Sequence, residues 1–182
     1  PALTTLVPNR MFRNAGGKKF EEVTTSGGFG HLQKGHGVAF GDIDHDGDQD
    51  IYVTMGGAME GDTFANLLFE NPAEDSRFIT LELEGTKSSR DALNARVAIQ
   101  LTTPDGPRTL FRTVGTGGSF GASSVQLEVG LGNATGVDSV EVTWPVTGVQ
   151  RYEGLERNRR YRLREGDAQA APLEVPGSTD EH

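Results

Sequence analysis

The chain of 182 residues contains no cysteine, and this absence excludes several kinds of site. Without thiols there is no disulfide framework, no thiolate zinc site and no cysteine nucleophile. A secreted protein can lack disulfides, so the compartment stays open on this ground alone. No apolar run approaches the ~20 residues that a membrane-spanning helix needs, which predicts a protein without a membrane span.

Positive charge is also scarce in this sequence. The 17 lysines and arginines stand against 26 aspartates and glutamates, which gives a formal net charge of −9. This balance disfavours nucleic acid or an anionic membrane as a partner and favours calcium or basic surfaces. The chain begins at Pro1 without a signal-peptide pattern, and we expect a processed protein or a fragment of a longer one.

A helical pattern is missing as well, because no window shows a convincing apolar stripe with a 3.6-residue period. Instead, 25 glycines separate short apolar runs, which predicts an all-β chain with many turns. The first seventy-odd residues read as four or five short strands, including a hairpin with a Gly-Gly turn at 9–25. From residue 77 onward, six or seven alternating segments predict an antiparallel β-sandwich. They are 77–85, 95–103, 108–115, 124–132, 138–145 and 159–165.

One short window, "GDIDHDGDQDIYV" at residues 41–53, crowds like charge. Its aspartates occupy alternate positions: Asp42, Asp44, Asp46, Asp48 and Asp50. Two carboxylates about 4 Å apart repel by roughly 4 kcal/mol at an effective dielectric of about 20, so we expect a cation among them. Calcium takes six to eight oxygen ligands, and Gly47 permits the sharp turn that lets the carboxylates converge. We therefore predict a Ca²⁺ site in which Asp48 offers its backbone carbonyl and Asp50 closes the loop.

Other interpretations of this window fit less well. An EF-hand needs a glutamate at the twelfth position of its loop, but the twelfth residue from Asp42 is Val53. The strand-like "IYVTM" that follows also excludes the helix that an EF-hand or a dockerin requires. Magnesium is less expected, because it keeps several of its waters and accepts few all-protein cages. A solvated acidic turn without metal stays open as the alternative.

These residues carry a resemblance to two known families. "GVAFGDIDHDGDQDIYV" resembles the calcium-binding core of an FG-GAP (VCBS) repeat, the blade unit of integrin-type β-propellers, and "NRMFRNAGGKKFEEVT" resembles the strands before it. Residues 76–166 resemble the ASPIC/UnbV domain, through "RDALNARV", "GLG" and "VDSVEVTWP" in that order. The resemblance implies a calcium-stabilised extracellular module without established chemistry, and it extends only to the five aspartates as site residues. Asn94 departs from the pattern, because the family usually has glycine there.

The remaining polar residues do not predict a catalytic site. Ser119 in "GGSFG" lacks the strand-to-helix setting of a nucleophile elbow and reads as part of a turn. The pair Arg90 and Asp91 is more typical of a turn cap than of a reactive site. No two of the four histidines have the spacing of a helical zinc site; they are His31, His36, His45 and His182. We therefore expect that the protein is not an enzyme.

Two features near the C-terminus could bind a sugar or an acidic polymer. Trp144 is the sole tryptophan, but its alternation with Val140 and Val142 favours a place in the core. On a strand at 159–165, the side chains of Arg160, Arg162 and Arg164 share one face, while Tyr161 and Leu163 face the core. A solvated outer face is the plainer interpretation of these arginines. Phe120 is a further aromatic residue that would serve a glycan.

Together these observations predict an all-β architecture in three parts. A propeller-type calcium-binding β-hairpin repeat at 1–75 is expected to pack with an antiparallel β-sandwich at 76–166, followed by a flexible tail at 167–182. The predicted function is an extracellular calcium-binding interaction or adhesion-type module, in which calcium is structural and no reaction is catalysed. The expected partner is a protein or glycan at the cell surface, or the rest of a longer propeller chain. The predicted location is secreted or on the cell surface, which in a bacterium means periplasmic or extracellular. The alternative is a carbohydrate-binding accessory module of a polysaccharide-acting protein.

Overall fold

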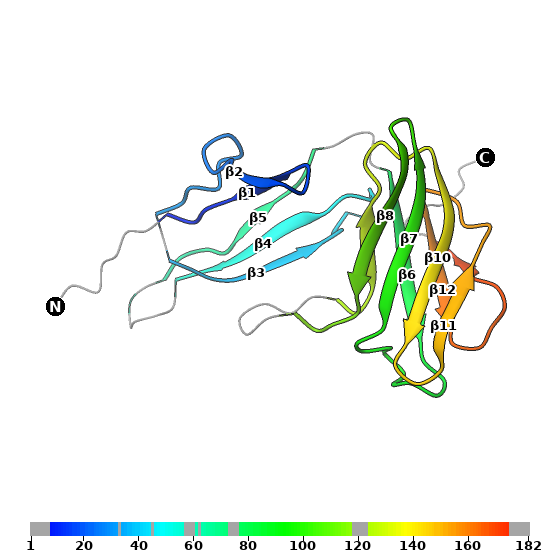
Figure 1. Cartoon of the computed structure of the whole chain (residues 1–182). Helices are drawn as coiled ribbons and strands as arrows, with labels where there is room; N and C mark the ends of the chain where they lie inside the picture. The colour runs from blue at the N-terminus through cyan, green and yellow to red at the C-terminus, as the bar shows by residue number, and fades with distance from the viewer. Residues whose placement is uncertain are drawn as a thin grey trace, which may run out of the picture. The chain divides into compact units, whose positions relative to one another are not determined.

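The computed structural model of the chain describes residues 8–32, 34–44, 46–56, 61, 63–72, 77–117 and 124–174. Within these ranges the regular structure is entirely β, with thirteen strands in four sheets (Figure 1). The all-β prediction is therefore confirmed. In the same ranges, no helix is long and apolar enough to cross a membrane.

The strands belong to two compact units, which are described separately here. The first comprises Pro1–Ala39 and Ile51–Phe69, and the second comprises Phe40–Asp50 and Glu70–His182. The division falls within strands β3 and β4, so the aspartate-rich segment between them groups with the C-terminal part of the chain.

The first unit begins with the hairpin that the Gly-Gly turn predicts. Strand β1 (Phe12–Ala15) pairs antiparallel with β2 (Lys19–Glu22). Gly16 and Gly17 take φ angles of 65° and 73°, which glycine adopts without steric cost. The Gly17 amide donates a hydrogen bond of 2.8 Å to the side-chain oxygen of Asn14, which closes the turn.

A three-stranded sheet follows, in the order β3-β4-β5. Its strands are β3 (Gly35–Gly41), β4 (Asp50–Met55) and β5 (Leu67–Phe69). In the described residues up to 72, Met55 is the one buried hydrophobic side chain. Several large apolar side chains of this part are exposed instead, among them Phe12, Phe20, Val38, Tyr52 and Leu68. The hairpin and the three-stranded sheet thus both leave apolar side chains exposed.

The second unit contains two four-stranded sheets. One has the order β11-β10-β7-β8 and the other β13-β12-β6-β9. The bounds are β6 (Phe78–Glu84), β7 (Arg96–Thr103), β8 (Gly106–Thr113), β9 (Leu127–Gly130), β10 (Gly136–Trp144), β11 (Gly148–Tyr152), β12 (Arg159–Arg164) and β13 (Ala171–Leu173).

One pairing differs from the predicted antiparallel arrangement. Strand β12 runs parallel to β6, with a register from Arg159↔Ile79 to Arg164↔Glu84, whereas the other pairs within these two sheets are antiparallel. The prediction of an antiparallel sandwich is wrong at this pair. Alternation with a period of two indicates which side chains face the core, but it carries no information on the direction of the neighbouring strand.

Both four-stranded sheets contribute to one hydrophobic core. Ile79 and Leu81 on β6 are fully buried, as alternation predicts, and so is Leu163 on β12. Trp144 on β10 has 2% of its surface exposed, and its indole N–H donates a hydrogen bond of 3.0 Å to Gln150. The expected core position of Trp144 is confirmed, and its ring offers no platform for a sugar.

Two local features bear on expectations from the sequence, and the first departs from them. Ala171–Leu173, in the predicted tail, forms strand β13 beside β12, while residues 175–182 lie outside the described ranges. Asn94 takes a φ of 69°, and its amide donates a hydrogen bond of 2.9 Å to the Val114 carbonyl. Asparagine tolerates this left-handed conformation better than most residues, which explains how it substitutes for the usual glycine.

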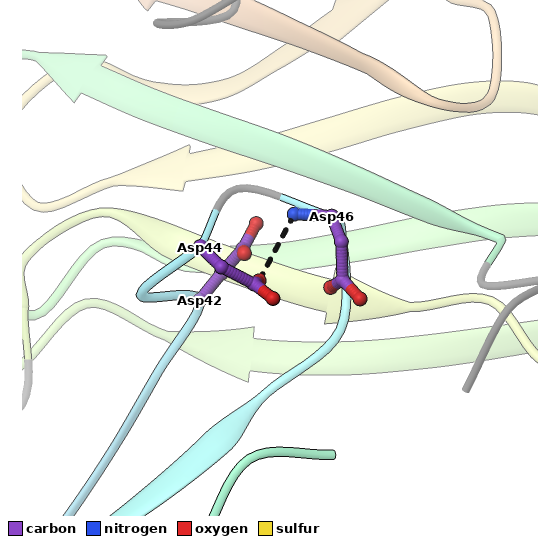
Figure 2. A group of neighbouring side chains, drawn as sticks. All are labelled: Asp42, Asp44 and Asp46. Carbon is purple, nitrogen blue, oxygen red and sulfur yellow. Dashed lines mark hydrogen bonds between the residues drawn. The ribbon is translucent and has the colours of Figure 1, made fainter. Parts of the chain in front are cut away.

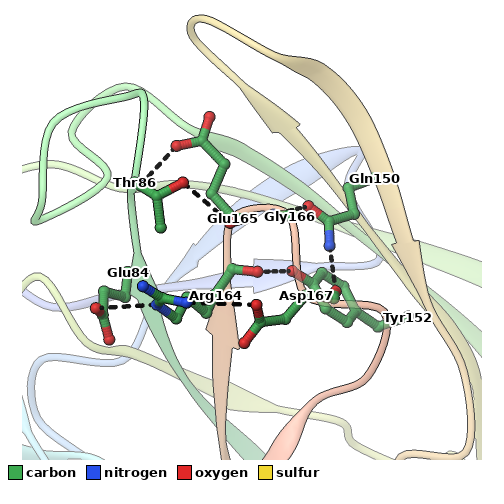
Figure 3. A network of polar contacts seen from close by, with 8 residues as sticks. All are labelled: Glu84, Thr86, Gln150, Tyr152, Arg164, Glu165, Gly166 and Asp167. Carbon is green, nitrogen blue, oxygen red and sulfur yellow. Dashed lines mark hydrogen bonds and ion pairs between the residues drawn. The ribbon is translucent and has the colours of Figure 1, made fainter.

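A buried carboxylate anchors the end of β12 (Figure 3). Glu165 is 2% exposed and accepts hydrogen bonds from the amides of Thr86, Lys87 and Ser88, at 2.7, 2.7 and 2.8 Å. The hydroxyls of Ser88 and Thr147 add bonds of 2.8 and 2.6 Å. Burial by itself raises the pKa of Glu165, but the hydroxyl and amide donors outweigh it and hold the pKa well below its ordinary value. The side chain is therefore an ionised structural anchor.

A second polar side chain completes this end of the unit. The Tyr152 hydroxyl is buried and donates a hydrogen bond of 2.8 Å to the Arg164 carbonyl (Figure 3). Burial, and then the nearby charge of Asp167, raises the pKa of Tyr152 to about 12. The phenol is thus neutral near pH 7 and serves as a hydrogen-bond donor.

Candidate metal centre

The aspartate-rich segment is the connection between β3 and β4, and it begins and ends at strand residues. Gly41 is the last residue of β3, and Asp50 is the first residue of β4. By its contacts, the segment Phe40–Asp50 belongs to the same compact unit as residues 70–182. His45, at its centre, lies outside the described residues.

Three of the predicted ligands converge in this loop (Figure 2). Asp42, Asp44 and Asp46 each offer one carboxylate oxygen, and these oxygens lie within 4.8 Å of one another. Asp42 is half-buried, whereas Asp44 and Asp46 are exposed. The Asp46 amide donates to the carboxylate of Asp44 at 3.3 Å, and the Gly47 amide donates to that of Asp42 at 3.2 Å. These bonds curl the backbone around the carboxylates.

Gly47 is the residue that makes this curl possible. Its φ is 94°, a conformation that residues with a side chain rarely adopt. A Cβ atom at this position would lie 2.0 Å from the ring of Phe78 on β6. Both the positive φ and the lack of space for a Cβ atom therefore favour glycine at position 47. The sequence suggested the first of these reasons.

The other two aspartates take different positions. Asp50 is 2% exposed, and its two oxygens accept hydrogen bonds from the amides of Ile43 at 3.0 Å and Asn71 at 2.9 Å. Through these two hydrogen bonds, Asp50 links the first part of the loop to the segment that follows β5. The Asp48 amide donates to the Asp46 carboxylate at 3.0 Å. Metal ligation by Asp48 and Asp50 stays a prediction, since the converging group consists of Asp42, Asp44 and Asp46.

Sequence reasoning missed one acidic residue at this loop. Glu128 on β9 accepts a hydrogen bond of 3.1 Å from the Asp42 amide and one of 3.3 Å from the Gln49 side chain. It lies 86 positions from Asp42 in the chain, so no local pattern links the two. Only the strand pairing of β9 with β6 places it there.

The donor set fits a hard cation such as calcium. All three converging side chains present carboxylate oxygens, which calcium and magnesium prefer over nitrogen or sulfur. Exposed carboxylates also occur together without an ion, but here a glycine turn and backbone hydrogen bonds hold them in one place. Asp42, Asp44 and Asp46 could therefore hold a divalent cation.

The arginine face of β12 is neutralised by acidic neighbours. Arg160 and Arg162 both form ion pairs with Glu82, at 2.9 and 3.3 Å, and Arg164 pairs with Glu84 at 3.3 Å. Tyr161 and Leu163 are buried, so the predicted division of faces is confirmed. Paired in this way, the arginines are typical of a solvated outer face rather than an anion site.

Several other residues are singled out in the sequence, and those that the structure describes do not belong to the cluster of Asp42, Asp44 and Asp46. Arg90 and Asp91 lie in the turn after β6, where the Arg90 carbonyl accepts a bond of 2.9 Å from the Gly85 amide. The ring of His31 packs edge-on against that of Phe69, with 6.0 Å between the ring centroids. His36 is exposed on β3. Ser119, Phe120 and His182 lie outside the described residues.

Comparison with protein families agrees with the motifs. A family described as "ASPIC and UnbV" matches residues 85–170, a range that contains strands β7 to β12. A family described as "FG-GAP-like repeat" matches residues 5–53, which include all five aspartates. A comparison with curated proteins found no match. The resemblance inferred from the sequence is thus confirmed: the chain contains an FG-GAP-like repeat at 5–53 followed by an ASPIC/UnbV domain at 85–170.

Proposed function

We propose that this protein is a calcium-binding interaction module of adhesion type, in which calcium is structural and no reaction is catalysed. The observation that carries the proposal is the convergence of Asp42, Asp44 and Asp46 within the FG-GAP-like repeat. Bound calcium would neutralise this cluster and hold the adjoining ends of β3 and β4 together. The three aspartates thus supply a ligand set, and their binding of calcium would have a structural consequence.

Calcium is preferred over magnesium for a geometric reason. The loop presents several oxygens on an irregular backbone, which suits calcium with its six to eight ligands at about 2.3–2.6 Å. Magnesium demands near-ideal octahedral geometry and gives up its waters reluctantly. Asp42, Asp44 and Asp46 would supply carboxylate oxygens, and the Asp48 carbonyl is the predicted addition.

The proposed location is outside the cytosol, either secreted or on the cell surface. Asp44 and Asp46 are exposed, so the site is open to solvent on one side. Such an open site fits the weak affinities of extracellular calcium modules, with Kd on the order of 10⁻⁴ to 10⁻³ M. Calcium at those concentrations is found outside cells rather than in the cytosol.

We further propose that the two parts have the architectures that their families suggest. The hairpin β1–β2 and the sheet β3-β4-β5 would form a propeller-type blade, and the two four-stranded sheets would form the layers of a β-sandwich. Exposed side chains such as Phe20, Tyr52 and Leu68 support the blade proposal, because a single repeat cannot bury its own apolar face. The rest of a longer propeller chain is therefore one proposed partner.

The proposed external partner is a protein or a glycan at the cell surface. Trp144 is 2% exposed, so stacking of a sugar on this ring is excluded without local unfolding. The arginines of β12 are engaged with Glu82 and Glu84. Both observations weaken the carbohydrate-binding accessory module as the alternative, and we place a protein partner first.

Isothermal titration calorimetry with calcium and with magnesium tests the proposed site. We expect one calcium site with a Kd on the order of 10⁻⁴ to 10⁻³ M and weaker binding of magnesium. Asp44→Asn removes one ligand charge while keeping the side-chain size, and it should weaken calcium binding about tenfold or more, by analogy with the loss of a supporting group. Asp138→Asn changes an exposed aspartate on β10 and is the matched control. Equal calcium binding by the wild type and Asp44→Asn would contradict the proposal, and so would the absence of binding.

A further inference from the structure

We infer that Glu128 is a positioning residue for the aspartate loop and couples its metal occupancy to strand β9 of the ASPIC/UnbV domain. The contact lies within one compact unit, since Phe40–Asp50 and residues 70–182 group together. The calcium dependence of this inference rests on the proposed function. Neither family match links Glu128 to the loop, because the repeat match ends at residue 53 and Glu128 belongs to the domain that follows.

The carboxylate of Glu128 is fixed at both oxygens. Oε2 accepts from the Asp42 amide at 3.1 Å and from the Gln49 side chain at 3.3 Å. Oε1 accepts from the side chain of Gln126, the residue just before β9, at 2.9 Å, which orients the group from the same part of the chain. Glu128 therefore holds the first aspartate of the loop and a residue near its end. Glu128 thus orients the backbone that carries Asp42, and it does so through hydrogen bonds rather than as a metal ligand.

Strand β9 gives this carboxylate a rigid base. Its neighbours Leu127 and Val129 are buried in the core, so Glu128 faces the other side of the sheet and is half-buried there. In register it pairs with Thr80 on β6. Gly47 also lies against β6, where a Cβ added at this position would meet the ring of Phe78 at 2.0 Å. The loop is thus held at two points on adjacent strands of one sheet.

The charge of Glu128 gives the coupling its direction. It adds a negative group beside a loop that already carries three converging carboxylates. Without a cation, this arrangement is repulsive, and the repulsion opposes docking of the loop on β9. A bound divalent cation turns this repulsion into a net attraction, because each nearby carboxylate is then attracted to the positive ion. Metal binding and docking on β9 should therefore strengthen each other, as thermodynamic linkage requires.

Two variants separate the hydrogen bonds of Glu128 from its charge. Glu128→Ala removes both, and it should weaken calcium binding about tenfold or more, the range that supporting groups of metal sites show. Glu128→Gln keeps an acceptor oxygen and removes only the charge, so it should show a smaller loss that diminishes at high salt. Glu141→Ala, which removes a half-buried glutamate on β10, is the matched control.

The test combines calcium titration calorimetry with amide hydrogen exchange on the full chain. In the wild type, calcium should slow amide hydrogen exchange in Leu127–Gly130 as well as in the loop. The control Glu141→Ala should show the same calcium-dependent slowing as the wild type. In Glu128→Ala, calcium should still slow exchange in the loop at saturating concentration but no longer in β9. A purely structural role would change exchange equally with and without calcium.

Two failures are distinguishable in this design. If the wild type binds calcium and Glu128→Ala binds it equally well with the same protection of β9, the inference about Glu128 is wrong and the proposed function stands. If the wild type shows neither binding heat nor calcium-dependent protection, the proposed function fails and the coupling fails with it. Glu128→Gln, which preserves side-chain volume, guards against misreading a variant that simply does not fold.

Discussion

Replacement of Glu165 by alanine should lower the free energy of unfolding of the ASPIC/UnbV part by about 3 to 5 kcal/mol, because a buried carboxylate and its network of hydrogen bonds are lost at once. The carboxylate accepts hydrogen bonds from the amides of Thr86, Lys87 and Ser88 and from two hydroxyls. A hydrogen bond to a charged group contributes about 1.5–3 kcal/mol. The change would be measured as a shift of the urea unfolding midpoint at pH 7.

The control for this variant is a glutamate with exposed contacts. Glu156→Ala removes a solvent-exposed ion pair with Arg159, and such pairs contribute about 0–1 kcal/mol. An unfolding free energy of Glu165→Ala within about 1 kcal/mol of the wild type would show that the five donors find other partners.

The same residue should govern part of the acid response. Because the folded-state pKa of Glu165 lies below its unfolded value, its contribution to stability is fully present above the ordinary pKa of 4.5. It is lost progressively as the pH falls below that value toward the folded-state pKa. Unfolding measured from pH 7 down to pH 3 should therefore show a steep loss of stability in the wild type. Glu165→Ala should show a shallower loss over the same range, and identical slopes would contradict the assignment.

Replacement of Gly47 by alanine should displace the aspartate loop and reduce calcium binding by about tenfold to a hundredfold, as for loss of a group that orients metal ligands. The new Cβ would lie 2.0 Å from the Phe78 ring, and the φ of 94° is itself strained for alanine. Backbone strain of this kind costs about 1–3 kcal/mol. Calcium titration calorimetry and urea unfolding of the variant measure the two effects separately.

Gly17→Ala is the matched control for backbone strain. Gly17 also has a positive φ, 73°, but a Cβ there would meet nothing within 4 Å. Gly17→Ala should lower the free energy of unfolding through backbone strain, and its Kd for calcium should equal that of the wild type. Calcium binding by Gly47→Ala at the wild-type Kd would mean that the contact with Phe78 does not set the loop geometry.

The features that the sequence predicted are those with a local signal. Alternation placed Ile79 and Leu81 on β6 and Leu163 on β12 in the core, because a strand exposes its faces with a period of two. The hairpin followed from its Gly-Gly turn. The convergence of Asp42 with its neighbours followed from like charges beside a glycine that permits the curl. Each of these signals lies within about a dozen residues.

The features that sequence reasoning missed join residues far apart in the chain. Glu165 directly follows an arginine-rich strand and reads as one more solvated charge, yet its amide donors lie 77 to 79 residues away, from Ser88 to Thr86. Glu128 meets Asp42 over 86 residues. Both contacts depend on strand neighbours, including the parallel pair of β6 and β12, which a single sequence does not reveal. The pairing and register of the strands therefore determine these long-range contacts, which local sequence patterns do not predict.

Calorimetric unfolding with calcium and with chelator, for the wild type and Asp46→Ala, tests the central claim most directly. Calcium at a hundredfold excess over its Kd stabilises the native state by about 2.7 kcal/mol. For a chain of this size, that energy corresponds to a rise in Tm of about 5 to 10 °C. We expect this calcium-dependent rise in Tm in the wild type and its loss in Asp46→Ala. An equal Tm with calcium and with chelator in the wild type would contradict a structural calcium site in this loop.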